Sequence, residues 1–166
     1  MSNKYIIILV ALVALFYLTR SPQQAPEVAL RSLNGTSATS TDPCANKERC
    51  IAVFLSPWCP ACKRAVTTIP ALREYCMRSD KVGFKVIVGR DSVEALESFA
   101  LSIGGQVFID AESEFYTGIK GSSIPGWWVW DENRNILAKF SGTFVGPKEV
   151  VIKRIIDDKL KLSEYF

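Results

Sequence analysis

Short apolar runs alternate with amphipathic segments from residue 51 to the end of the chain. Five runs rich in β-branched and aromatic residues predict strands, over Ile51–Leu55, Phe84–Val88, Val107–Ile109, Trp127–Trp130 and Ile136–Phe140. Apolar residues spaced by three and four predict helices, over Ala61–Arg78, Ser92–Leu101, Ser113–Ile119 and Pro147–Leu162. Strands that alternate with helices, followed by a hairpin and a closing helix, predict an α/β fold in which helices flank a central mixed sheet.

The first of these helices contains Pro70, which we expect to kink it, because proline lacks the N–H that an inner helical turn requires. Cys76 lies on the apolar stripe of the same helix, in line with Ile69 and Leu72. A free cysteine in such a stripe usually behaves as a small hydrophobic residue. We therefore expect Cys76 to be buried.

The chain begins with an uninterrupted apolar run, Tyr5–Leu18. Its length falls below the roughly 20 residues that span a membrane and is typical of a signal-peptide core. No small-residue cleavage site follows closely, so we expect residues 1–20 to be an uncleaved signal anchor, a single transmembrane helix; a cleaved signal peptide is the alternative. Residues 21–42 are rich in Ser, Thr, Pro, Gln and Ala, which predicts a flexible linker before a domain at 43–166.

Composition narrows the function classes. The 166 residues carry a formal charge of +3 without a basic run, so no nucleic-acid partner is expected. Five cysteines are many for a cytosolic chain of this size and suit an oxidising compartment. The chain has no histidine, which removes the commonest catalytic base.

The stretch Ser56–Lys63 (SPWCPACK) carries the candidate chemistry. It follows a predicted buried strand and opens a predicted helix, so Cys59 is expected at the helix N-cap with Pro60 at the first helical position. Unpaired backbone N–H groups at this end favour an anion, which should stabilise the thiolate of Cys59. Cys62 lies one turn further on. This spacing predicts an attacking thiol, Cys59, and a resolving thiol, Cys62, as disulfide exchange requires.

Two other interpretations of the cysteines remain open. Cys59 and Cys62 could form a zinc site with Cys44 and Cys50, although structural zinc sites usually pair two short knuckles and the spacings here fit that poorly. Inert structural cysteines are the second. We expect no metal and no cofactor at this site.

The chain resembles the thioredoxin superfamily over residues 51–162. The family's W-C-x-x-C-K site is matched by Trp58–Lys63, its Ile-Pro opposite the dithiol by Ile124 and Pro125, and its glycine after the last strand by Gly142. The resemblance implies a thioredoxin fold, a cis bond at Pro125, and a backbone at Ile124 that is offered to a substrate strand. It also implies that Trp58 and Pro60 line the substrate surface.

Within the superfamily the chain is most similar to the membrane-anchored TlpA-like branch. The interval from Cys62 to Pro125 is longer than in plain thioredoxin, which suggests the strand–helix element that these proteins insert. Two departures matter. Val53 occupies the position of thioredoxin's buried proton-transferring aspartate, and Pro60–Ala61 replaces the Gly-Pro between the cysteines. Because that dipeptide tunes thiolate stability, the direction of electron flow stays open.

Cys44 and Cys50 stand just before the first predicted strand. In an oxidising compartment they are expected to close a small loop as a structural disulfide. A second redox pair that passes electrons to Cys59 and Cys62 is the alternative.

Together these features predict an extracytoplasmic thiol–disulfide oxidoreductase that reduces protein disulfides through Cys59 and Cys62. A disulfide oxidase or isomerase, or a thiol-dependent copper chaperone on the same fold, is the alternative. The expected partners are protein thiols and disulfides and a membrane electron-transfer protein. The family likeness and the anchor imply a single pass through a bacterial inner membrane with the domain in the periplasm, or a soluble periplasmic protein if the signal is cleaved.

Overall fold

The computed structural model describes residues 8–9, 22–40 and 44–166. Within these ranges no helix has both the length and the apolar composition to cross a membrane. The expected anchor at 1–20 lies outside the described residues, apart from Ile8 and Leu9. The fold below therefore concerns residues 22 onward.

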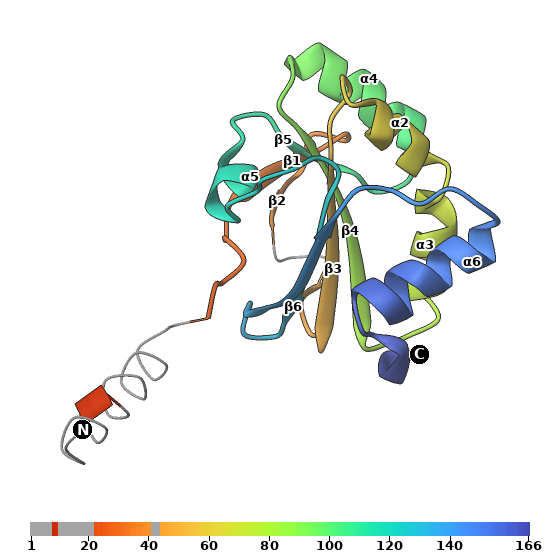
Figure 1. Ribbon diagram of the computed structural model, residues 1–166. Helices are drawn as coiled ribbons and strands as arrows, with labels where there is room; N and C mark the ends of the chain where they lie inside the picture. The colour runs from red at the N-terminus through yellow and green to blue at the C-terminus, as the bar shows by residue number, and fades with distance from the viewer. Residues whose placement is uncertain (1–7, 10–21, 41–43) are drawn as a thin grey trace.

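A seven-stranded mixed sheet forms the centre of the molecule (Figure 1), in the order β2-β1-β5-β4-β3-β6-β7. Its strands are β1 (Ala29–Ser32), β2 (Ser37–Thr39), β3 (Arg49–Leu55), β4 (Val82–Gly89), β5 (Phe108–Asp110), β6 (Gly126–Asp131) and β7 (Ile136–Ser141). The strands β3, β4 and β5 are parallel, while β6, β7, β1 and β2 join antiparallel. All five predicted strands are confirmed, and the mixed character of the sheet with them.

Helices cover both faces of the sheet, as predicted (Figure 1). One face carries α2 (Pro60–Val66), α3 (Ile69–Cys76), α4 (Val93–Ile103), α6 (Lys148–Lys153) and its π-helical continuation η2 (Arg154–Lys159). The other carries α5 (Glu114–Gly118). A short 3-10 turn, η3 (Ser163–Tyr165), ends the chain. The two faces bury separate hydrophobic clusters, because successive side chains of β3 point to opposite sides.

The predicted helix over Ala61–Arg78 is two helices. α2 ends at Val66 and α3 begins at Ile69, with Thr67 and Thr68 between them. Pro70 therefore lies in the first turn of α3 and does not kink a continuous helix. A missing N–H has no cost in a first turn, so the chain restarts the helix there.

The expected linker at 21–42 is wrong for its described part. β1 and β2 lie within it, and β1 pairs with β5 at one end of the sheet. Upstream of β1, Gln24 bridges to Asn135 near the opposite edge, and the Ala25 N–H donates to the Arg134 carbonyl at 2.8 Å. Residues 22–40 thus cross the α5 face of the sheet from the β7 side and then form its last two strands, β1 and β2; we call residues 22–40 the belt below.

Buried side chains hold the belt in place. Leu30 and Ala25 are each 1% exposed and belong to the same cluster as α5. The belt's end is held by Lys85, a β4 side chain that is 1% exposed. Its Nζ donates to the carbonyls of Thr39, at 3.3 Å, and Ser40. A segment with few apolar residues is thus held through two buried side chains, Ala25 and Leu30, and through the hydrogen bonds of Lys85.

Candidate active site

The two cysteines of the SPWCPACK stretch lie where β3 leads into α2. Cys59 is the N-cap of α2, with extended backbone angles, and Pro60 is the first helical residue. The Cys59 Sγ accepts the backbone N–H of Cys62 at 3.3 Å. This is the N-cap geometry expected from the sequence, with sulfur in place of the usual oxygen acceptor.

The thiols differ in exposure. Cys62 is fully buried and Cys59 is 5% exposed, both in the cluster under α2. Burial raises the pKa of the Cys62 thiol well above its ordinary value, and its hydrogen bond to Cys59 raises it further. Val53, on β3, is fully buried in the same cluster. Cys62 is therefore held as a protonated thiol beneath Cys59.

The Ile124–Pro125 peptide bond is cis, as the sequence resemblance implied. The Ile124 carbonyl accepts a hydrogen bond from the Cys59 Sγ at 3.5 Å, so this loop lies directly against the first cysteine. On its other side the Pro125 carbonyl accepts the Gly142 N–H at 3.0 Å. Gly142 has a φ of 101°, a conformation that favours glycine. The residues singled out just before β6 and just after β7 thus meet at one place beside the dithiol.

Trp58 forms the exposed wall of this site. Its side chain is 56% exposed, and its indole Nε1 donates to the Arg90 carbonyl at 2.9 Å. Pro60 is also exposed, at the start of α2. The predicted site residues Trp58, Cys59, Pro60 and Ile124 are therefore brought together around one sulfur atom.

Two residues of the site were not singled out from the sequence. Arg90 follows β4 and accepts hydrogen bonds from both Trp58 and the fully buried Ser56, the latter at 3.5 Å. The signal for Arg90 was its place directly after a buried strand parallel to β3, since carboxyl ends of adjacent parallel strands meet at one edge. Ser56 stood in the motif itself, as the first residue after β3.

Cys44 and Cys50 form a disulfide, as predicted. They lie at the opposite end of β3 from Cys59 and in the cluster of the opposite face. Cys50 lies in β3, and the five strand residues that follow it, at about 3.3 Å each, span roughly 17 Å toward the Cys59 end. Thiol–disulfide exchange needs contact between sulfurs. Direct electron transfer from this pair to Cys59 and Cys62 is therefore not supported within one chain.

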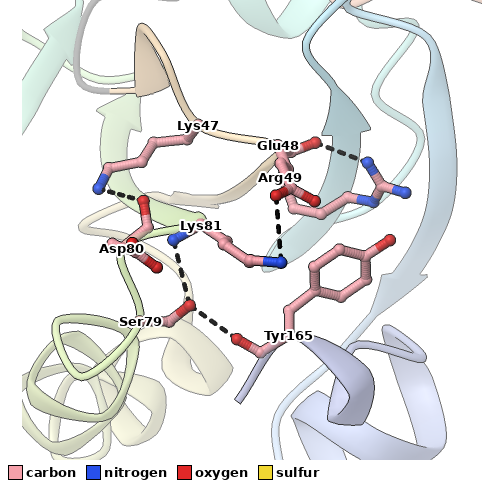
Figure 2. A network of polar contacts seen from close by, with 7 residues as sticks. All are labelled: Lys47, Glu48, Arg49, Ser79, Asp80, Lys81 and Tyr165. Carbon is pink, nitrogen blue, oxygen red and sulfur yellow. Dashed lines mark hydrogen bonds and ion pairs between the residues drawn. The ribbon is translucent and has the colours of Figure 1, made fainter.

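A polar network fixes the loop that the disulfide closes (Figure 2). Lys47 Nζ donates to the Asp80 carbonyl at 2.6 Å, and Glu48 pairs with Lys81 at 3.3 Å. The Arg49 guanidinium lies 4.6 Å from the ring centroid of Tyr165. These contacts tie the disulfide loop to the start of β4 and to the end of the chain.

In the described part of the chain, no group of three or more His, Cys, Asp or Glu side chains is placed to hold an ion. The remaining free cysteine, Cys76, is 1% exposed, as predicted.

Solved structures with the same fold are numerous. DsbF of Mycobacterium tuberculosis superposes with a TM-score of 0.63 at 16% identity, over 82% of this chain and 97% of that one. A secreted M. tuberculosis disulfide oxidoreductase homologous to E. coli DsbE gives 0.62 at 17%, over 78% and 94%. StoA from Bacillus subtilis gives 0.60 at 19%, over 80% and 98%. No protein-family model and no curated protein matches the sequence.

At these identities the likeness shows the fold. The chain has the thioredoxin-like fold that its sequence predicted, and the resemblance to TlpA-like proteins is confirmed at that level. The helix α4 and the strand β5 stand between β4 and α5, in the interval where an inserted strand–helix element was expected.

Proposed function

We propose that this protein is an extracytoplasmic thiol–disulfide oxidoreductase that reduces protein disulfides through Cys59 and Cys62. The observation that carries the proposal is the position of the Cys59 Sγ, at a helix N-cap and against the Ile124 carbonyl of a cis-proline loop. Solved structures with the same fold include a secreted disulfide oxidoreductase of Mycobacterium tuberculosis, which supports the proposal.

The steps of disulfide reduction follow from the different surroundings of Cys59 and Cys62. The Cys59 thiolate attacks one sulfur of a substrate disulfide, and the other substrate sulfur leaves as a thiolate that takes up a proton. The Cys62 thiol then loses its proton and attacks the Cys59 sulfur of the mixed disulfide. The second substrate thiol is released, and Cys59 and Cys62 become a disulfide. Two electrons have passed from the enzyme to the substrate.

Proton removal from Cys62 is the demanding part of this sequence, because burial and the hydrogen bond to Cys59 favour its protonated form. When Cys59 enters the mixed disulfide, it no longer carries negative charge, so one cause of the raised pKa of Cys62 disappears. The order of events, Cys59 first and Cys62 second, is therefore supported by electrostatics as well as by exposure.

Turnover requires a source of electrons. We propose a membrane electron-transfer protein as the reductant, with residues 1–20 anchoring the chain in a bacterial inner membrane and the domain in the periplasm. The apolar run Tyr5–Leu18 supports this arrangement. A cleaved signal and a soluble periplasmic protein would serve the same chemistry.

The test is the reduction potential of Cys59 and Cys62, obtained by equilibrating the protein with glutathione redox buffers and quantifying the thiols. A thioredoxin-like value, at or below about −230 mV, supports a reductase. A value near that of the oxidant DsbA, about −120 mV, would make the protein an oxidase or isomerase. Absence of reversible exchange would contradict the oxidoreductase proposal altogether.

A further inference from the structure

Arg90 has an unusual backbone conformation and lies at the edge of the dithiol site. It is the first residue after β4 and has a φ of 65°, in the left-handed region that non-glycine residues seldom adopt. Its carbonyl accepts hydrogen bonds from Trp58 Nε1, at 2.9 Å, and from Ser56 Oγ, at 3.5 Å. The backbone of Arg90 thus holds both ends of the turn that leads to Cys59, and its side chain begins beside the exposed indole.

The side chain of Arg90 is stacked and exposed. Its guanidinium lies 5.0 Å from the ring centroid of Tyr116, on α5. Among the described residues, no acidic side chain forms an ion pair with it. The carboxylate of the next residue, Asp91, accepts the Ser92 N–H at 2.8 Å. An arginine stacked on an aromatic ring keeps its in-plane N–H groups free to bind a carboxylate.

Two further cations lie on the helix that begins at the dithiol. Lys63 and Arg64 follow Cys62 on α2, and both are exposed. Neither forms an ion pair within the described part of the chain. The positive charges of Lys63 and Arg64 are therefore available to a partner.

We propose that Arg90 is a specificity-determining residue that binds a carboxylate next to the reactive disulfide of the partner protein, while Trp58 packs against the same segment. The inference rests on the proposed function and names its substrate class, an acidic disulfide-containing segment. The carbonyl of Arg90 holds its backbone to Trp58, the residue next to Cys59, and the ring of Tyr116 holds its guanidinium.

The experiment uses the full chain with dithiothreitol as reductant and two disulfide-bonded peptides that differ only in a Glu or a Lys beside one cysteine. The readout is the ratio of kcat/KM for the Glu peptide to that for the Lys peptide. We expect the wild-type protein to favour the Glu peptide by about fivefold, since charge-assisted hydrogen bonds at a partly exposed site are of this order.

Three variants sharpen the test. Arg90→Gly retains access to positive φ and removes the guanidinium, so the ratio should fall toward one. Arg90→Glu should invert the preference. Lys153→Glu makes the same change of charge on the exposed surface of α6 and should leave the ratio as in the wild type. Each variant is compared with itself on two peptides, so a general loss of activity cancels.

Equal turnover of the two peptides by the wild-type protein would overturn the role of Arg90, whatever the variants do. So would a ratio that Arg90→Gly leaves unchanged, or a shift as large in Lys153→Glu as in Arg90→Glu. If the wild-type protein reduces neither peptide and no other disulfide substrate, the proposed function itself fails. Reduction of both peptides at the same rate refutes the specificity alone.

Discussion

The two ends of β3 each carry a pair of cysteines, and their surroundings differ in almost every respect. At the carboxyl end, Cys59 caps a helix and touches the Ile124 carbonyl, and a half-exposed indole stands beside it. At the amino end, Cys44 and Cys50 are joined within a loop that ion pairs and hydrogen bonds fix to neighbouring segments (Figure 2).

The reactivity of a cysteine in this protein therefore depends on where the cysteine lies in the fold. At the carboxyl end the strand leads into a helix, and a backbone N–H of its first turn, that of Cys62, meets the Cys59 sulfur. The other end offers a polar network and a buried cluster. The same residue type is therefore a candidate catalyst at one end of the strand and a covalent link at the other.

The largest expected effect concerns the dithiol end. Cys62→Ser should accumulate mixed disulfides between Cys59 and substrate proteins, because the resolving thiol is gone. Cys59→Ser should accumulate none, because Cys62 is buried and its pKa is raised. Non-reducing electrophoresis of cell extracts or of insulin incubations measures both. Equal trapping by the two variants would contradict the assigned order.

The belt should be indispensable to the disulfide end. Leu30→Ala should lower the free energy of unfolding by about 3 kcal/mol, because a leucine that is 1% exposed leaves a cavity in the cluster containing Cys44 and Cys50. Urea denaturation measures the change. Leu137→Ala is the matched control, since Leu137 is 51% exposed on β7 and should cost no more than about 0.5 kcal/mol. Similar small effects at both positions would restore the linker interpretation.

Removal of the Cys44–Cys50 disulfide should lower the stability of the protein and leave its catalytic activity nearly unchanged. The double variant Cys44→Ala, Cys50→Ala should lose about 2 kcal/mol of stability, since the bond closes a loop with a sequence separation of only 6. Reduction of insulin by dithiothreitol should stay close to the wild-type rate. A loss of activity as deep as that of Cys59→Ser would show instead that Cys44 and Cys50 take part in electron transfer.

The smallest expected effect concerns Cys76, whose thiol should make the stability of the fold depend on pH. Burial raises the pKa of this thiol to about 12, so the fold favours its protonated form. The resulting stabilisation is complete below the unfolded pKa of about 8.5 and is lost as the pH rises from there toward 12.

The free energy of unfolding of the wild-type protein should therefore fall by about 1 kcal/mol more than that of Cys76→Ala between pH 7 and pH 9.5. Urea titrations at the two pH values measure this difference. Parallel behaviour of the two proteins would show that Cys76 ionises as freely in the fold as in the unfolded chain.

The local sequence was enough to predict an element where a single segment contains the whole pattern for it. The run Ile51–Leu55 and the Cys59–Cys62 motif predict a strand, a turn and a capped helix from adjacent residues, and these elements are confirmed. The pairing of Cys44 with Cys50 was also predictable, because the two cysteines are near neighbours in the sequence.

Prediction failed where the partner of a segment lies far along the chain. Leu30 has only Val28 at strand spacing and Leu33 at helical spacing, which is too short a pattern to predict an element within residues 21–42. Its burial depends on a surface built by α5, β5 and β6. The break between α2 and α3 was missed because Pro70 has the same local meaning in a kink and in a first turn.

The α/β class, the dithiol at the start of a helix and the proline loop as its candidate neighbour follow from the amino-acid sequence, because each has a recognisable local motif. The path of the belt across one face of the sheet, and the hydrogen bond from Trp58 to the Arg90 carbonyl, are visible only in the folded molecule. Such contacts join residues tens of positions apart. Which of many such pairs forms depends on the packing of the whole sheet, and no local pattern records it.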